Sequence, residues 1–122
     1  MTSDLRHALG LQGEQLAATH LRRLGYELVA RRHRTRFGEL DLVARDGDTL
    51  VFVEVKTRRA GPTGPWAALD EHKQAQVRRM AAAYLAEVQD RPFASELRFD
   101  AIGVTIDATG ALVALEHLEG AF

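Results

Sequence analysis

Two β-rich runs in the middle of the chain, separated by only three residues, constrain the fold more than any other feature. Residues 38–45 and 49–57 are rich in apolar side chains, and Asp46-Gly47-Asp48 lies between them. An Asp-Gly pair between two such runs is a strong signal for a β-hairpin. The chain is therefore expected to contain an antiparallel strand pair at its centre.

The segments around this hairpin predict two helices and three further strands. The first helix is predicted over residues 3–24, directly before Gly25, and the second over residues 70–88, with Asp70 as its N-cap. The remaining strands are predicted over residues 26–32, 97–106 and 112–118, with an arginine-rich turn after residue 32 and a loop over residues 58–65. This order predicts an α/β fold with a mixed central sheet flanked by helices.

The composition limits the class of protein further. With 122 residues, 46% of them apolar, the chain has the size and apolar content of a single globular domain, expected over residues 1–122. It contains no cysteine, which excludes thiol catalysis and cysteine-zinc sites. No apolar run approaches the roughly 18 residues of a membrane span, and no export signal precedes the first helix. We therefore expect a cytoplasmic protein that does not enter a membrane.

The hairpin brings acidic residues onto one predicted face of the sheet. If residues 46 and 47 form a two-residue turn, the pairing places Asp41 opposite Phe52, and Asp41 becomes a diagonal neighbour of Glu54. Two carboxylates at that separation can bind one divalent cation. A three-residue turn would instead put Asp41 and Glu54 on opposite faces. With the shorter turn, the residues that share the face are Glu39, Asp41, Phe52, Glu54 and Lys56.

Each predicted helix also carries one charged residue on its apolar side. Lys73 begins the apolar stripe of the second helix, which continues through Val77 and Met80. Only Lys56 and Lys73 are lysines among sixteen cationic residues, which suggests sites where a compact ammonium is needed. Burying such charges is costly unless they are paired or bind an ion. The stripe of the first helix consists of Gly10, Glu14, Ala17, Leu21 and Leu24.

Arginine clusters lie on segments next to the acidic face. Near-neutral net charge (−1) conceals a basic N-terminal third, and arginines beside a metal site suit contacts with a phosphate backbone. A solvated rim in an arginine-rich sequence explains the same clusters without a ligand. The candidate nucleic-acid-binding residues are Arg31, Arg32, Arg34, Arg36, Arg58 and Arg59.

These residues resemble the motifs of a known nuclease superfamily. Gly38-Glu39-Leu40-Asp41, followed by Glu54-Val55-Lys56, resembles the PD-(D/E)xK superfamily, which includes type II restriction enzymes and archaeal Holliday-junction resolvases. The usual proline is replaced by Leu40. A wider set of motifs is similar to the YraN family of small, endonuclease-like bacterial proteins, over essentially the whole chain. That set adds Gly13-Glu14, Gly25-Tyr26, Phe52 to Arg58, Lys73, Arg98-Phe99-Asp100 and Ala121-Phe122.

The resemblance implies a restriction-endonuclease-like αβββαβ core and a metal-dependent site. Asp41 and Glu54 would hold Mg²⁺ or Mn²⁺, and the backbone carbonyl of Val55 would complete the set. Glu14 would assist from the first helix, directly or through a water. The expected activity is hydrolysis of phosphodiester bonds in DNA, with branched or structured DNA suggested by the resolvases.

The resemblance also assigns roles to the two lysines. Lys56 would orient or deprotonate the attacking water, or stabilise charge on the phosphate, and these roles are not separable from the sequence. Lys73 would neutralise the phosphate or hold Glu54 in position. Cutting both strands of a junction needs two sites, so the resemblance also implies a symmetric homodimer.

Two other functions fit the same residues. The chain could be a nucleic-acid-binding module that keeps the fold without turnover. Alternatively, Glu14, Lys56 and Lys73 could neutralise Asp41 and Glu54 in a structural ion-pair network that binds no metal.

Overall fold

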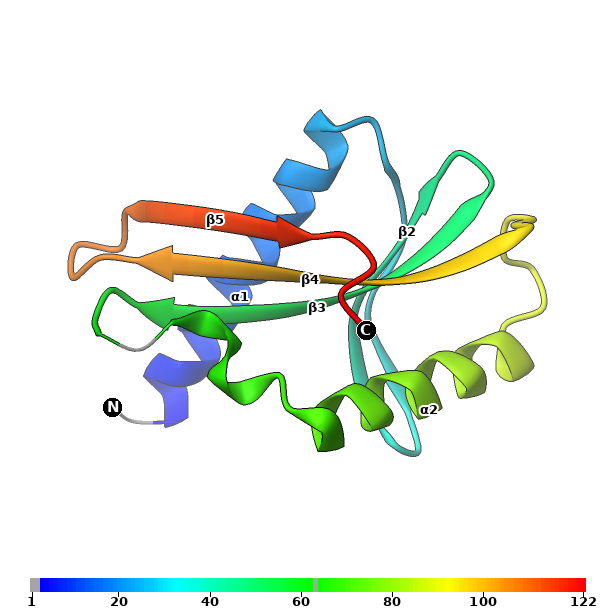
Figure 1. Cartoon of the computed structure of the whole chain (residues 1–122), viewed down its shortest axis with the longest axis horizontal. Coiled ribbons are helices and arrows are strands. Elements are labelled where there is room, and N and C mark those ends of the chain that lie inside the picture. The colour runs from blue at the N-terminus through cyan, green and yellow to red at the C-terminus, as the bar shows by residue number, and fades with distance from the viewer. Residues whose placement is uncertain (1–2, 63) are drawn as a thin grey trace.

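The computed structural model describes residues 3–62 and 64–122, and it contains the predicted elements in the predicted order (Figure 1). One short 3-10 helix, η1, lies before the second helix. The elements are α1 (Ser3–Arg23), β1 (Glu27–Thr35), β2 (Gly38–Asp46), β3 (Thr49–Arg59), η1 (Pro65–Ala68), α2 (Glu71–Glu87), β4 (Glu96–Ile106) and β5 (Leu112–Leu118).

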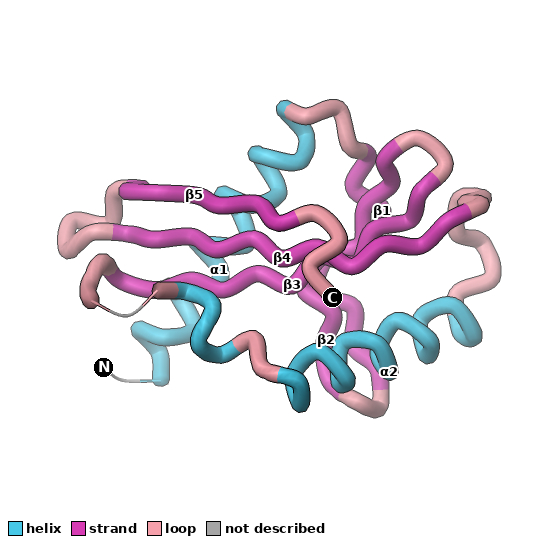
Figure 2. Tube along the Cα trace, in the orientation of Figure 1, coloured by secondary structure: helices cyan, strands magenta, loops and turns pink. Residues whose placement is uncertain are grey.

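The strands form one mixed sheet in the order β1-β2-β3-β4-β5 (Figure 2). Consecutive strands pair antiparallel except β3 and β4, which are parallel and are connected through α2. Helix α1 covers one face of the sheet and α2 lies over the other, as Figure 1 shows. The fold is therefore α/β with the αβββαβ element order of a restriction-endonuclease-like core, as predicted.

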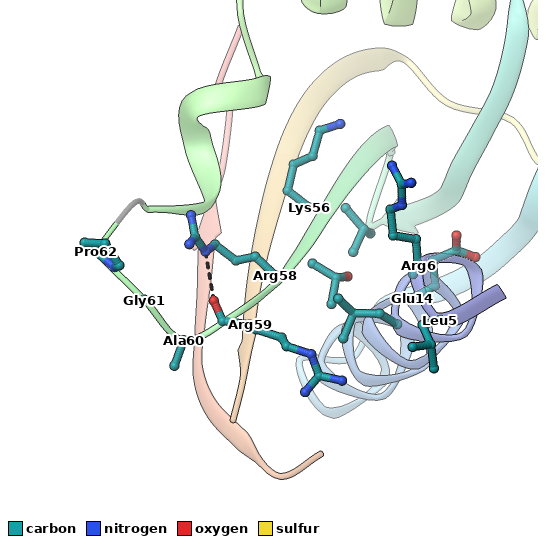
Figure 3. A pocket seen from close by; sticks show the side chains of 13 residues that line it. Leu5, Arg6, Glu14, Lys56, Arg58, Arg59, Ala60, Gly61 and Pro62 are labelled. Carbon is teal, nitrogen blue, oxygen red and sulfur yellow. Dashed lines mark hydrogen bonds between the residues drawn. The ribbon is translucent and has the colours of Figure 1, made fainter. Parts of the chain in front are cut away.

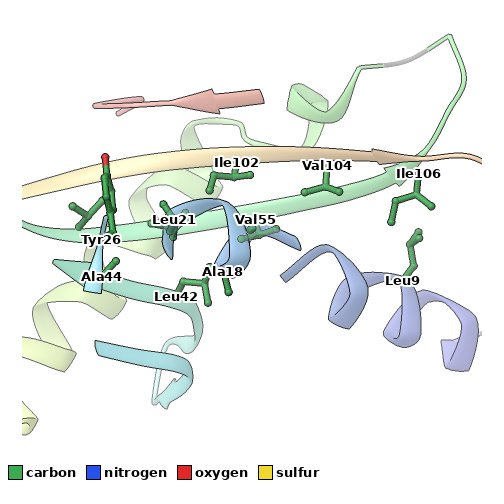
Figure 4. Close-up of a cluster of buried hydrophobic side chains, with 13 residues drawn as sticks. Leu9, Ala18, Leu21, Tyr26, Leu42, Ala44, Val55, Ile102, Val104 and Ile106 are labelled. Atoms are coloured by element: carbon green, nitrogen blue, oxygen red, sulfur yellow. The ribbon is translucent and has the colours of Figure 1, made fainter. Parts of the chain in front are cut away.

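Strand β3 is apolar on both faces because each face is covered by a helix. Val51, Val53 and Val55 belong to the cluster that packs against α1 (Figure 4), whereas Leu50 and Phe52 belong to the cluster under α2. A strand buried on both sides has a near-continuous apolar sequence, as β3 does. Any charged side chain in the middle of β3 is consequently held between packed layers.

The predicted helix ends are confirmed. Gly25 has a φ of 90°, and the amide of Tyr26 donates to the carbonyl of Leu21 at 3.0 Å, which closes α1 in the manner of a Schellman motif. The Asp70 side chain accepts from the Lys73 amide at 2.9 Å and caps α2. One expectation was wrong: Leu24 lies beyond the last turn of α1 and is 53% exposed, so it does not belong to the apolar stripe.

Two arginine segments are strands rather than turns or loops. Strand β1 continues to Thr35 because Arg34 and Thr35 still pair with β2, so the predicted turn after residue 32 begins later. Strand β3 continues through Arg58 and Arg59, which pair with β4. Both segments are stabilised by neighbouring strands that local sequence signals do not reveal.

The register of the central hairpin differs from the predicted one by two residues. Phe52 pairs with Val43 rather than with Asp41, and Asp46 pairs with Thr49, so the turn consists of residues 47 and 48. Gly47 has a φ of 60° and takes the first turn position, as in a type II′ turn. A turn of Asp46 and Gly47 would need a positive φ at both residues, but of these two only Gly47 has one. A shift of two preserves the alternation of side chains along the paired residues.

A close approach between α1 and β3 depends on Gly13. A Cβ on Gly13 would overlap the Thr57 side chain, whereas a Cβ on Gly10 would meet no atom within 4 Å. We expect Gly13→Ala to lower the free energy of unfolding by about 1–3 kcal/mol through overpacking. Gly10→Ala should raise it by about 0.5–1 kcal/mol because alanine favours helix. Urea denaturation of both variants checks this, and equal effects would contradict the assigned contact.

Candidate active site

The candidate site lies where β2 separates from β3. The β2–β3 ladder ends at the Leu42–Val53 pair, while residues 38–40 of β2 pair with β1 alone. Beyond this point the Val55 amide donates to Asp41 Oδ2 at 2.8 Å. We call this region the fork. The Asp41 carboxylate takes the place of a backbone acceptor there.

The fork arises from a local change of direction in both β1 and β2. Leu42 packs toward α1, but Leu40, two residues away, packs toward α2. In β1, Arg32 has a φ of 48°, a left-handed conformation that is uncommon outside glycine. One predicted placement is therefore wrong: Glu39 does not share the face of Glu54 but lines a groove with Glu14 on the α1 side. The predicted alternation fails because the strand is irregular between the two leucines.

Glu54 is buried and contacts both lysines of the chain. Its side chain is 4% exposed, and its Oε1 lies 3.5 Å from Lys56 Nζ and 3.4 Å from Lys73 Nζ. Lys56 follows two residues later on the same face of β3, and Lys73 lies in the first turn of α2 above the Asp70 cap. The structure thus brings together Glu54, Lys56 and Lys73, and of the two roles for Lys73 it supports holding Glu54 in position.

Glu14 approaches the same region from α1. The Gly13–Thr57 contact brings this part of the helix against β3, and the Glu14 side chain is only 14% exposed. Burial raises the pKa of Glu14, and the negative charges of Glu39 and Glu54 add to this effect, while Arg32, at 4.0 Å, opposes it. Figure 3 shows Glu14 and Lys56 in a groove of about 940 Å³ between α1 and the end of β3.

The three carboxylates influence one another. Burial raises the pKa of Asp41 well above its usual range, and the charges of Glu54 and Glu14 raise it further. The hydrogen bond from the Val55 amide and the charge of Lys73 lower the pKa of Asp41, but not by enough to cancel the increase. A carboxyl with a raised pKa beside other acids is typical of a functional site.

Asp41 should therefore destabilise the folded protein at neutral pH. Because its pKa is raised on folding, its stabilising contribution is present below the usual aspartate pKa and is lost as pH rises through the folded value. We expect Asp41→Asn to raise the Tm at pH 7.5 by a few degrees and to make little difference at pH 4. Thermal melts at both pH values test this, with Asp46→Asn as an exposed control. An unchanged or lower Tm at pH 7.5 would contradict the assigned repulsion.

The donor set of the fork fits a hard divalent cation. Among the described residues, no three His, Asp or Glu side chains form a metal site by themselves. Asp41 and Glu54 supply carboxylates, and the Val55 carbonyl projects to the same side as its amide, into the fork. Mg²⁺ commonly uses one or two carboxylates and takes its other ligands from water and substrate phosphate. An all-oxygen set with few protein ligands suits that cation and Mn²⁺.

Three of the predicted nucleic-acid-binding arginines contact protein side chains. Arg31 Nη2 donates to Gln15 at 3.0 Å, and Arg32 lies near Glu14 as described above. Arg34 Nη2 lies 3.7 Å from Glu39. The β1 arginines therefore pair in part with their own protein.

The other three arginines have no carboxylate partner among the described residues. Arg36 lies over the ring of Phe37, with 4.7 Å between its Cζ and the ring centroid. Arg58 donates to the carbonyls of Arg59 and Gly64, and Arg59 donates to the carbonyl of Asp107. Arg58 and Arg59 line the groove in Figure 3 together with Arg6, which was not predicted because no other arginine lies near it in the sequence.

A second polar cluster surrounds Asp100, a residue of the motif Arg98-Phe99-Asp100. Asp100 is fully buried in β4 and accepts two hydrogen bonds from Arg98, at 2.8 and 3.0 Å, and one from His117 at 2.8 Å. Burial opposes ionisation, but these bonds and the Gly120 amide outweigh it and hold the pKa of Asp100 at about 2. His117 also contacts His20 of α1 at 3.0 Å. The cluster joins α1, β4, β5 and the chain end; the role of the histidines was not predicted.

The fold and the fork together define an α/β protein with a restriction-endonuclease-like core and an acidic cluster at a sheet irregularity. No helix in the described ranges is long and apolar enough to cross a membrane. Residues 13–104 match the family model of the uncharacterised protein family UPF0102, and the chain belongs to this family, which is the YraN family of the resemblance.

Relatives from distant bacteria match over nearly the whole chain. A UPF0102 protein of Nocardia farcinica is 47% identical over 118 residues, 96% of this chain and 91% of its own length. One of Frankia casuarinae is 49% identical, covering 96% and 98% of the two chains. One of Geobacter metallireducens is 44% identical, covering 94% and 92%. None of these names states an activity.

Proposed function

We propose that this protein is a divalent-metal-dependent endonuclease that hydrolyses phosphodiester bonds in DNA. The observation that carries the proposal is that the Val55 amide binds Asp41 at the fork, directly after Glu54, whose carboxylate lies beside Lys56. Such a combination of oxygen ligands and an ammonium suits the hydrolysis of a charged phosphodiester. Acting on DNA, the enzyme would work in the cytoplasm.

The proposed roles follow from these positions. Asp41, Glu54 and Val55 would hold Mg²⁺ or Mn²⁺, and Glu14 would contribute directly or through a water. When bound, the cation lowers the pKa of a coordinated water and neutralises charge on the phosphate. Lys56 would direct the attacking water or stabilise the phosphate.

Lys73 would act through Glu54. Its ammonium lies 3.4 Å from Glu54 Oε1, and its backbone amide donates to the Asp70 cap in the first turn of α2, so Lys73 would hold the carboxylate in one orientation. The preference for branched DNA rests on the resemblance to resolvases. Cutting both strands of a junction would require two copies of the chain, and we propose a symmetric dimer for that reaction.

One alternative has direct support in the structure. Both lysines contact the same oxygen of Glu54, so an ion-pair network without metal accounts for the charges as well. Such a network should also neutralise Asp41, but the pKa of Asp41 stays well above its usual range although the charge of Lys73 lowers it. We therefore favour the nuclease.

A cleavage panel tests the proposal. Labelled single-stranded, duplex, flap and four-way-junction DNA, with an RNA duplex as comparison, would be incubated with Mg²⁺, Mn²⁺ or EDTA. We expect metal-dependent cutting by the wild type that is lost in Asp41→Asn. Binding without cutting, together with a Tm that does not respond to metal, would favour the binding module instead.

A further inference from the structure

Two arginines from different elements meet at one aromatic ring beside the fork. The guanidinium carbons of Arg36 and Arg79 lie 4.7 Å and 5.9 Å from the ring centroid of Phe37. Both side chains are exposed, and neither has a carboxylate within 4.0 Å among the described residues. Each guanidinium group is attracted to the ring, and its N–H donors are left without a carboxylate partner among the described residues, so the pair suits an anionic ligand.

The ring itself is held in place. Phe37 lies in the β1–β2 turn, and its carbonyl accepts from Gln76 Nε2 of α2 at 2.9 Å. Gly38 allows this approach because a Cβ there would lie 2.8 Å from the Gln76 amide nitrogen and 3.1 Å from the sulfur of Met80. The two arginines therefore occupy a built junction between the β1–β2 turn and α2, not a loose surface.

A shallow concavity adjoins the two guanidinium groups. It has a volume of about 420 Å³, and its other walls are Ala82, Ala83, Ala86 and Glu87 of α2, with the acidic side chain at the end away from Lys73. Small side chains leave room for a bulky group to lie against the helix. An exposed pair of arginines beside such a surface suits a phosphate attached to a sugar, since guanidinium groups bind phosphate oxygens in pairs.

One side of α2 leads from the fork to the two arginines at Phe37. Lys73, Gln76 and Arg79 are spaced three residues apart and follow one side of the helix. Lys73 contacts Glu54 at one end, and Arg79 contacts Phe37 at the other. At 1.5 Å per residue, the axial separation of Lys73 and Arg79 is roughly 9 Å, so the two side chains can reach different phosphates of one DNA strand.

We propose that Arg36 and Arg79 clamp a backbone phosphate of a bound DNA strand where the β1–β2 turn meets α2. This inference rests on the proposed function. The strand continues past the fork into the groove of Figure 3, which Arg6, Arg58 and Arg59 line together with Lys56. We call Arg36, Phe37 and Arg79 the arginine clamp. By holding a phosphate at the β1–β2 turn, the arginine clamp would determine on which side of the fork that part of the DNA lies.

Binding measured without cleavage tests the arginine clamp. Fluorescein-labelled duplex and four-way-junction DNA would be titrated in EDTA, by anisotropy, across a range of NaCl concentrations. We expect Arg79→Ala and Arg36→Ala each to raise Kd by about 5- to 10-fold at 0.1 M salt. Each should also reduce the slope of log K against log salt by about 0.9, the value for one lost phosphate contact. Arg79→Lys should recover the slope but only part of the affinity, because lysine keeps the charge without the planar group.

Arg23→Ala provides a matched control. Arg23 ends α1, is exposed, and has no carboxylate partner in the described part of the chain, as is also true of Arg36 and Arg79. Its replacement by alanine removes the same single positive charge. It should change Kd by less than about 2-fold. If Arg79→Ala and Arg36→Ala behave like Arg23→Ala, the clamp is wrong even if the wild type cuts DNA. If they weaken binding but the wild type cuts nothing, the clamp stands and the proposed nuclease fails. No binding by the wild type overturns both.

Discussion

Glu54→Gln is expected to lower metal-dependent cleavage by at least about 10³-fold while the protein remains folded. The substitution keeps the size of a side chain that is 4% exposed, but it removes the charge that contacts Lys56 and Lys73. A neutral amide is a poor ligand for Mg²⁺, and the ammonium groups lose the group that positions them. Initial rates with saturating Mg²⁺ measure the loss, and Glu96→Gln, an exposed change at the start of β4, is the control.

The same variant separates the nuclease from the ion-pair network. In the nuclease, the loss of two ion pairs is offset by relief of repulsion with Asp41, so the free energy of unfolding should change little. If the cluster serves only stability, breaking it should cost about 3–5 kcal/mol, and metal should leave the wild-type Tm unchanged. A large loss of stability with no metal response would therefore reject the proposed site.

Asp100→Asn should produce the largest loss of stability, about 3–5 kcal/mol at pH 7, because it removes a fully buried charge from its partners. Arg98 and His117 would then lose the carboxylate that accepts their hydrogen bonds. Urea denaturation measures the effect. Asp46→Asn, which removes the 3.3 Å ion pair between Arg98 and an exposed aspartate, should cost less than about 1 kcal/mol.

The pH dependence gives this prediction a second readout. Because folding lowers the pKa of Asp100 to about 2, its contribution is present above the usual aspartate pKa near 4 and is lost as pH falls through 2. The difference between wild type and Asp100→Asn should therefore shrink between pH 4 and pH 2. A constant difference over that range would show that the cluster is not held by the charge.

The sequence was sufficient for the elements, their order and the residues that gather at the fork. Apolar periodicity identified both helices, and the Asp-Gly pair located the hairpin. The inward positions of Glu14 and Lys73 were predictable because each interrupts an apolar stripe. Those signals are local, and they depend only on neighbours three or four residues away.

The geometry of the fork was not predictable by the same reasoning. Strict alternation assumes a regular strand, but Arg32 adopts a positive φ, and Leu40 and Leu42 face opposite sides. The arginines were also assigned as one group. Whether an arginine meets a carboxylate, as Arg34 does, or an aromatic ring, as Arg36 does, depends on strand pairing and on the docking of α2.

The hydrogen bond between Asp41 and Val55 ties the chemistry of the fork to the integrity of the sheet. A change that removes the carboxylate without supplying another acceptor leaves a backbone amide unsatisfied, at a cost of about 1–3 kcal/mol. Under the proposed function, a relative that loses catalysis is therefore still constrained at position 41. Asparagine is one base change away and can accept the same hydrogen bond, so we expect it at position 41 in relatives that lose the proposed activity but keep the fold. An apolar residue at position 41 should appear only where the β2–β3 junction has a different structure.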